Sequence, residues 1–153
     1  TTHAAVDVPA ELAYTQPDRQ YGSQPTALHV ACKAGHLRAV QCILRLQGCE
    51  RAINSHNGKD KCTALHIAAS EGHDDIASCL LQSDTFTAVN ALDSCQCTAL
   101  HTACHWEQER IAMKIIQDPM FTMHGHKCRN GWTALRWAEE LKLPLVIDAL
   151  RKL

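Results

Sequence analysis

Apolar and polar positions recur in the same order four times along the chain. The word T-A-L-H starts at Thr26, Thr63 and Thr98, and T-A-L-R starts at Thr133, so successive copies lie 37, 35 and 35 residues apart. Self-similarity at this period is typical of proteins built by stacking one small supersecondary unit. We therefore expect four copies of one unit that pack side by side.

A second apolar group follows each word at a fixed distance. In copy two it consists of Ile76, Ala77, Leu80 and Leu81, whose spacing places them on one face of an α-helix. The equivalent positions hold the same kind of residue in the other copies, with one charge at the last position of copy four: Ala39, Val40, Ile43 and Leu44; Ile111, Ala112, Ile115 and Ile116; Val146, Ile147, Leu150 and Arg151.

Each copy is therefore predicted to form two short helices. The threonine hydroxyl can cap the free N–H groups of the first turn of the first helix. Gly35 and Gly72 end that helix in copies one and two, where a left-handed residue starts the turn to the second helix. Polar connectors such as residues 54–62 and 90–97 follow the second helix, and Asn57-Gly58 favours a tight hairpin turn.

These words resemble the ankyrin repeat family, whose unit is T-P-L-H-x-A-A-x-x-G-H, a second helix and a hairpin that ends in V-N-A-x-D. Copy two is the most similar, with TALHIAASEGH and then VNALD at residues 89–93. All four copies have Ala in place of Pro, the connectors are longer than usual, and copies three and four lack the Gly-His. The resemblance covers residues 26–153. It implies an all-α ankyrin-repeat solenoid of stacked helix-turn-helix units with hairpin-like loops.

The resemblance also suggests the division of the chain. We expect an ankyrin repeat domain at 25–153, with repeats at approximately 25–57, 58–92, 93–127 and 128–153. Residues 1–24 would form an N-terminal extension, in which 7–14 favour a short capping helix with Pro9 in its first turn.

Composition excludes some classes of function. The formal net charge of the 153 residues is −1, which argues against sequence-independent nucleic-acid binding. No apolar run is long enough to predict a membrane span. The chain has nine cysteines, an odd number. Some of them, such as Cys42 and Cys79, occupy equivalent positions in successive copies, which is not how cysteines are placed in a disulfide framework. We therefore expect a reducing intracellular compartment, the cytoplasm or the nucleus.

Catalytic motifs are missing from the sequence. It contains no Gly-rich phosphate loop, no H-E-x-x-H and no G-x-S-x-G, so we expect neither an enzyme nor a cofactor. The acidic pair Asp74-Asp75 is expected on a solvated helix face. The sequence also leaves open a targeting arm of a larger enzyme.

Histidines and cysteines suggest one alternative, a metal- or redox-responsive regulatory module. Its candidate ligands are His124, His126 and Cys128 with Cys95 and Cys97, although their spacing is not that of a zinc knuckle. The recurrent His29, His66 and His101 are expected to be structural instead, because stacked copies hold them about 10 Å apart. In the family, the first histidine hydrogen-bonds the backbone of the hairpin.

The function that the resemblance implies is non-catalytic protein–protein interaction through a concave face of hairpins and first helices. Such a module would be an adaptor, a scaffold or an inhibitor that acts by occlusion, and a monomer. Trp106 and Trp132 are expected to open onto that face. The turn at Glu107 is expected to be disturbed, at a backbone cost of about 1 kcal/mol if it stays left-handed. The C-terminal half of that face carries His105, Trp106, Arg129 and Trp132. This predicts a partner with an apolar or aromatic anchor and with an acidic group for Arg129. By the same mapping, the candidate partner-binding residues are Lys33, Lys59, Asp60, Ser70, Glu71, Ser94, Cys95, His105, Trp106, Arg129, Asn130, Trp132 and Glu140.

Overall fold

The computed structural model describes residues 24–153, so the capping helix expected at 7–14 lies outside the described residues. Every regular element in the described range is helical, and the hairpin loops contribute isolated bridges. None of the helices at 24–153 is long and apolar enough to cross a bilayer. The elements are α2 (Ala27–Ala34), α3 (Leu37–Leu44), α4 (Glu50–Ile53), α5 (Ala64–Glu71), α6 (Asp74–Gln82), η1 (Ala88–Asn90), α7 (Ala99–His105), α8 (Glu109–Gln117), α9 (Ala134–Glu140) and α10 (Pro144–Arg151).

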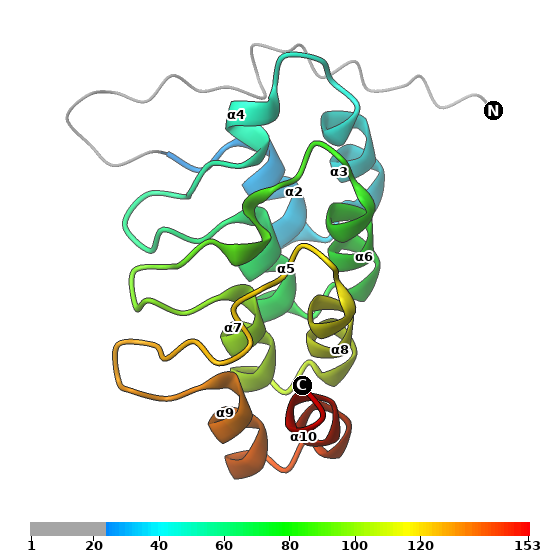
Figure 1. Cartoon of the computed structure of the whole chain (residues 1–153). Helices are drawn as coiled ribbons and strands as arrows, with labels where there is room; N and C mark the ends of the chain where they lie inside the picture. The colour runs from blue at the N-terminus through cyan, green and yellow to red at the C-terminus, as the bar shows by residue number, and fades with distance from the viewer. Residues whose placement is uncertain (1–23) are drawn as a thin grey trace.

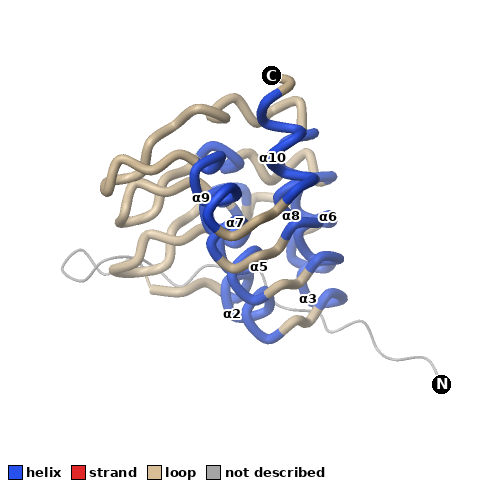
Figure 2. Tube along the Cα trace, turned by 90° about the horizontal axis from the view of Figure 1, so that it is seen from below, coloured by secondary structure: helices blue, strands red, loops and turns tan. Residues whose placement is uncertain are grey.

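Four antiparallel helix pairs stack into a solenoid, which confirms the predicted fold class. The first helices α2, α5, α7 and α9 form one column, and the second helices α3, α6, α8 and α10 form the other (Figure 1). The long loops project from the first-helix column, away from the second helices (Figure 2). We number the repeats one to four by these helix pairs.

The apolar groups found in the sequence form the core between the columns. In repeat three, Ile111 and Ile115 are buried, as are Ile76 and Leu80 in repeat two. Burial of one such side chain stabilises the fold by about 1.5–3 kcal/mol. The apolar face of the second helix is less complete in repeat four. Val146 is buried there, whereas Ile147 and Leu150 are half-buried and Arg151 is exposed.

The turn between the paired helices is left-handed in every repeat. Its φ angle is 75° at Gly35, 74° at Gly72, and 56° at both Glu107 and Lys142. Glu107 therefore keeps the left-handed turn of the glycine copies, which is the case in which a backbone cost of about 1 kcal/mol is expected. A β-carbon on Gly72 would lie 2.8 Å from Nε2 of Gln108 in the next repeat, so this glycine also provides space.

Replacing Glu107 with glycine is expected to stabilise the protein by about 1 kcal/mol, because a residue with a β-carbon is strained in the left-handed region. The midpoint of urea unfolding would rise, whereas Glu107→Ala, which keeps the β-carbon, would leave it nearly unchanged. A Glu107→Gly midpoint at or below that of the unmodified protein would contradict the strain.

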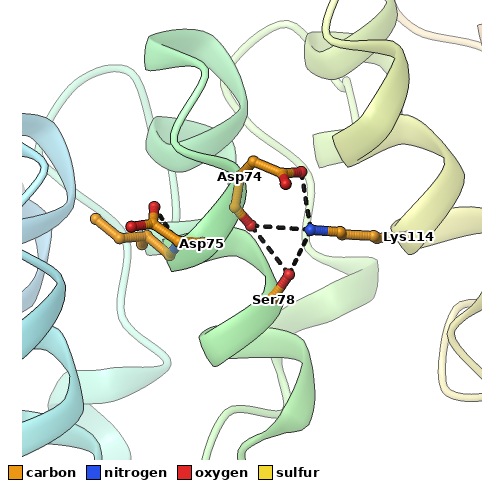
Figure 3. A network of polar contacts seen from close by, with 5 residues as sticks. Asp74, Asp75, Ser78 and Lys114 are labelled. Atoms are coloured by element: carbon orange, nitrogen blue, oxygen red, sulfur yellow. Dashed lines mark hydrogen bonds and ion pairs between the residues drawn. The ribbon is translucent and has the colours of Figure 1, made fainter.

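An ion pair ties the second helices of repeats two and three together. Lys114 Nζ lies 2.8 Å from Asp74 Oδ1, and it donates to the Asp74 carbonyl and to Ser78 Oγ at 3.2 and 2.5 Å (Figure 3). About a third of each charged side chain remains exposed, so the stabilisation is modest. The sequence predicted a solvated helix face for Asp74. In the structure its carboxylate instead pairs with Lys114 of the neighbouring helix.

The loops are held to one another along the stack. Ser94 N donates to Asp60 O at 2.8 Å, and Arg129 N donates to Cys95 O at 2.9 Å, so successive hairpin tips are hydrogen-bonded. The hairpin between α4 and α5 is wider than the tight turn expected at Asn57-Gly58. It closes between Asn57 and Cys62, with Lys61 in the left-handed region. The connector of repeat one also contains α4, which the pattern did not predict.

Candidate functional site

In repeats one to three, a threonine and a histidine fix the start of the first helix. In repeat two, the Thr63 N–H donates to Nδ1 of His66 at 3.2 Å, as part of a Thr–His capping box. Nε2 of His66 lies 3.0 Å from the carbonyl of Cys97 in the following hairpin. Because Nδ1 accepts from a backbone N–H, Nε2 carries the proton and donates to that carbonyl. This confirms the expected structural role of the recurrent histidine.

The same arrangement holds in the neighbouring repeats. Nε2 of His29 lies 3.1 Å from Ser55 O, and Nε2 of His101 lies 2.9 Å from His126 O. Repeat four has Arg136 at this position, and Thr133 Oγ1 instead accepts from the Arg136 backbone N–H at 3.2 Å. The hairpin carbonyl that accepts from the histidine always belongs to the connector that follows its helix pair.

Burial keeps these histidines neutral. His29, His66 and His101 are each 1% exposed, and burial lowers the pKa of all three below the ordinary value of 6.5. Their hydrogen bonds to hairpin carbonyls raise the pKa, but this effect is smaller than that of burial. Near neutral pH the histidines under the hairpins therefore bring no positive charge to the face above them.

A groove of about 350 Å³ lies between the hairpins and the first helices of repeats two to four. Space is available there because Ser70 and Thr102 are small, whereas repeat four has Glu140 and Trp137 at the equivalent positions. The groove is lined by Cys62, His66, Ser70, Asp93, Cys95, Cys97, His101, Thr102, His105, Trp106, Asn130 and Trp137.

Aromatic rings form a row here, and three of them, His105, Trp106 and Trp137, line the groove. His105 packs edge-on against Trp106 and Trp137, with ring centroids 5.2 and 4.8 Å apart. Trp137 packs in turn against Trp132 at 4.5 Å, and the Arg136 guanidinium carbon lies 4.2 Å from the centre of the Trp132 ring. The row therefore has a covered end at Trp132 and an open end at Trp106, which is 55% exposed.

The hairpin residues of the lining bring a carboxylate and thiols to the groove. Asp93 Oδ1 accepts hydrogen bonds from Cys95 N and Cys97 N at 2.8 and 2.9 Å, which fixes the hairpin tip. Burial, with a contribution from Asp93, raises the pKa of Cys62 to about 11, and the same two causes raise the pKa of Cys97. Both thiols are therefore protonated at neutral pH, which disfavours them as redox nucleophiles.

The mapping from sequence recovered part of this lining. Ser70, Cys95, His105, Trp106 and Asn130 come together in the groove. Trp132 is half-buried beneath Arg136 and does not line it. The mapping missed Asp93, in the connector at 90–97, and Trp137, together with the lining residues from beneath the hairpins. The remaining predicted residues lie outside the groove, all exposed except the half-buried Ser94: Lys33, Lys59, Asp60, Glu71, Ser94, Arg129 and Glu140.

The alternative metal site finds no support among the residues that the structure describes. No three His, Cys, Asp or Glu side chains in that range are arranged to hold an ion. His126 Nε2 lies 2.9 Å from Gln96 O, and the Cys128 thiol donates to Asn130 Oδ1 at 2.6 Å. These side chains hold the hairpins in shape.

Comparison with models of protein families gives a match. A family model described as ankyrin repeats, in three copies, matches residues 11–90, which are 80 of the 153 residues. The match includes the helix pairs of repeats one and two and ends at the last residue of η1. No curated protein matches the chain. Domains built from such repeats generally mediate protein–protein interaction and are typically non-catalytic.

Proposed function

This chain belongs to the ankyrin-repeat family, and from that premise we propose that its hairpin and first-helix face binds a segment of another protein. The groove between repeats two and four is the centre of this site. The binding domain comprises residues 25–153, and it acts without a cofactor, as a monomeric adaptor or as an inhibitor that covers its partner. Nine free thiols support work in the reducing cytoplasm or nucleus.

The observation that carries the proposal is Trp106. More than half of this large ring is exposed, beside a groove that its neighbours line. Tryptophan is enriched among residues that dominate binding energy, and a half-covered ring next to a hollow leaves room for a partner's side chain. The stack is held by contacts between adjacent repeats, so its face exists before the partner arrives, and little conformational entropy is lost on binding.

Truncation of Trp106 tests the proposal. Trp106→Ala is expected to lower the affinity for a partner captured with the unmodified domain by at least about tenfold, because it removes the open end of the aromatic row. The affinity of each variant would be measured by calorimetry with the purified partner. Met120→Ala is the matched control, since Met120 is 63% exposed and does not line the groove.

Both variants must melt at the temperature of the unmodified protein. Equal affinities for Trp106→Ala and Met120→Ala would place the binding site elsewhere on the domain. Trp132→Ala is a poorer probe, because that ring supports Trp137 and carries the Arg136 guanidinium.

A further inference from the structure

The groove lining combines aromatic rings with a single carboxylate. Asp93 is half-buried at the hairpin tip, and both hydrogen bonds that it accepts within the described residues go to Oδ1. Its Oδ2 is therefore available to a donor from outside the protein. A lone carboxylate with a spare oxygen in a partly closed groove favours a cationic ligand, because a charge-assisted hydrogen bond strengthens as water is displaced.

The groove lining brings no Lys or Arg to this carboxylate, and its histidines are His66, His101 and His105. His66 and His101 lie beneath the hairpins as neutral rings whose Nδ1 atoms accept from threonine N–H groups. The exposed Arg129 lies at the tip of the next hairpin but does not line the groove, and the exposed Glu71 follows the lining residue Ser70.

The aromatic row already holds one guanidinium. Arg136 places its guanidinium carbon 4.2 Å from the centre of the Trp132 ring at the covered end of the row. Arginine stacks on aromatic faces because its guanidinium is planar and weakly hydrated. Trp106, at the open end, presents an exposed ring without such a cover among the described residues.

We propose that the groove takes an arginine side chain from an extended segment of the partner, with its aliphatic stem against Trp106 and its guanidinium on Asp93 Oδ2. This inference rests on the proposed function and specifies the anchor that the groove selects. An arginine suits both the ring and the carboxylate, since its stem packs on apolar surface while its head remains polar. A lysine stem would pack on the same ring, but its strongly hydrated ammonium would offer the carboxylate a point charge in place of the planar fork of N–H donors.

Blocked peptides can test this without knowledge of the partner. The probes are acetyl-Gly-Arg-Gly-amide and two counterparts with citrulline or norleucine in the centre, added at millimolar concentration to the whole chain. Binding is followed by NMR through the indole N–H signals of Trp106 and Trp137. The arginine peptide is expected to shift these signals saturably, with an affinity about tenfold higher than that of the neutral, isosteric citrulline peptide. Added salt should weaken the binding of the arginine peptide and leave the binding of the two neutral peptides unchanged.

Asp93→Asn is the decisive variant. Asparagine can still accept the hairpin N–H groups, as Asn130 does when its Oδ1 accepts from Trp132 N at 3.0 Å. The variant should therefore fold, and unchanged amide spectra outside the hairpin would establish this. Its affinity for the arginine peptide is expected to fall to that of the citrulline peptide, whereas its affinity for the citrulline peptide stays the same. Glu71→Gln, an acid outside the lining, should change neither affinity by more than about twofold.

Three results would overturn the inference. The first is equal binding of the arginine and citrulline peptides, the second is tighter binding of the norleucine peptide, and the third is no shift of either indole signal by any peptide. None of these removes the proposed function, whose own test is the loss of partner binding in Trp106→Ala. If the norleucine peptide binds most tightly and Trp106→Ala still abolishes partner binding, the groove takes an apolar anchor instead.

Discussion

Acidification below pH 6.5 is expected to lower the free energy of unfolding steeply, by up to about 4 kcal/mol per pH unit. Burial lowers the pKa of His29, His66 and His101 in the folded protein below the ordinary 6.5. Between the folded and unfolded pKa values the unfolded chain therefore binds up to three more protons than the folded one. The stability that these histidines provide is complete above pH 6.5 and is lost as the pH falls through their folded pKa values.

Urea unfolding at a series of pH values measures this slope. Each His→Gln replacement at these three positions should lower the slope by about one third, because one titrating group is removed from the unfolded chain. Glutamine at the third position of a capping box can still accept from the threonine N–H, so the variants should fold. Arg136→Gln, at the equivalent position of repeat four, is the matched control and should leave the slope unchanged. A flat profile between pH 6.5 and pH 5 would refute the linkage.

Much of the fold could be predicted because one pattern sets several interactions at once. The word T-A-L-H specifies a capping threonine, two core residues and a histidine that reaches the next hairpin, so its recurrence determines the repeat and its register. The apolar group Ile76, Ala77, Leu80 and Leu81 determines which face of the second helix is turned inward. These are local relations of spacing, and a single sequence displays them directly.

The groove was harder to predict because it depends on how successive repeats are displaced. Asp93 belongs to one hairpin and Trp137 to a helix more than forty residues later, and no local spacing relates them. The signal that could have indicated the hollow is the small size of Ser70 and Thr102 at positions where repeat four has larger side chains. The Lys114–Asp74 pair was missed for a similar reason, since it joins two second helices 40 residues apart.

Repeat four uses the position of the recurrent histidine differently. In repeats one to three, the histidine connects the start of its own helix to a hairpin that follows its helix pair. Arg136 makes no such bond to a hairpin within the described residues. Its guanidinium instead lies over Trp132 and supports the covered end of the aromatic row. Arg136 thus contributes to the aromatic row rather than to a bond between repeats within the described residues.

Replacement of His66 with alanine is expected to destabilise the protein by about 3–5 kcal/mol. It leaves the N–H of Thr63, which is 0% exposed, without its partner, removes the bond to Cys97 O, and opens a cavity under the hairpin. Because that bond joins repeat two to the hairpin of repeat three, cooperativity should also fall. Urea unfolding followed by circular dichroism would show a lower midpoint and a shallower slope.

Two further variants separate the causes of this loss. His66→Gln can accept from Thr63 N but cannot also reach Cys97 O, so it should lose only about 1–2 kcal/mol. Arg136→Ala makes a comparable truncation at the equivalent position, where the described residues form no hairpin bond, and should lose no more than about 1 kcal/mol through the contact with Trp132. If Arg136→Ala costs as much as His66→Ala, the histidine stabilises its own helix alone. If the inter-repeat bond is the main contribution, His66→Ala should be the least stable variant and His66→Gln the next, with Arg136→Ala nearest the unmodified protein.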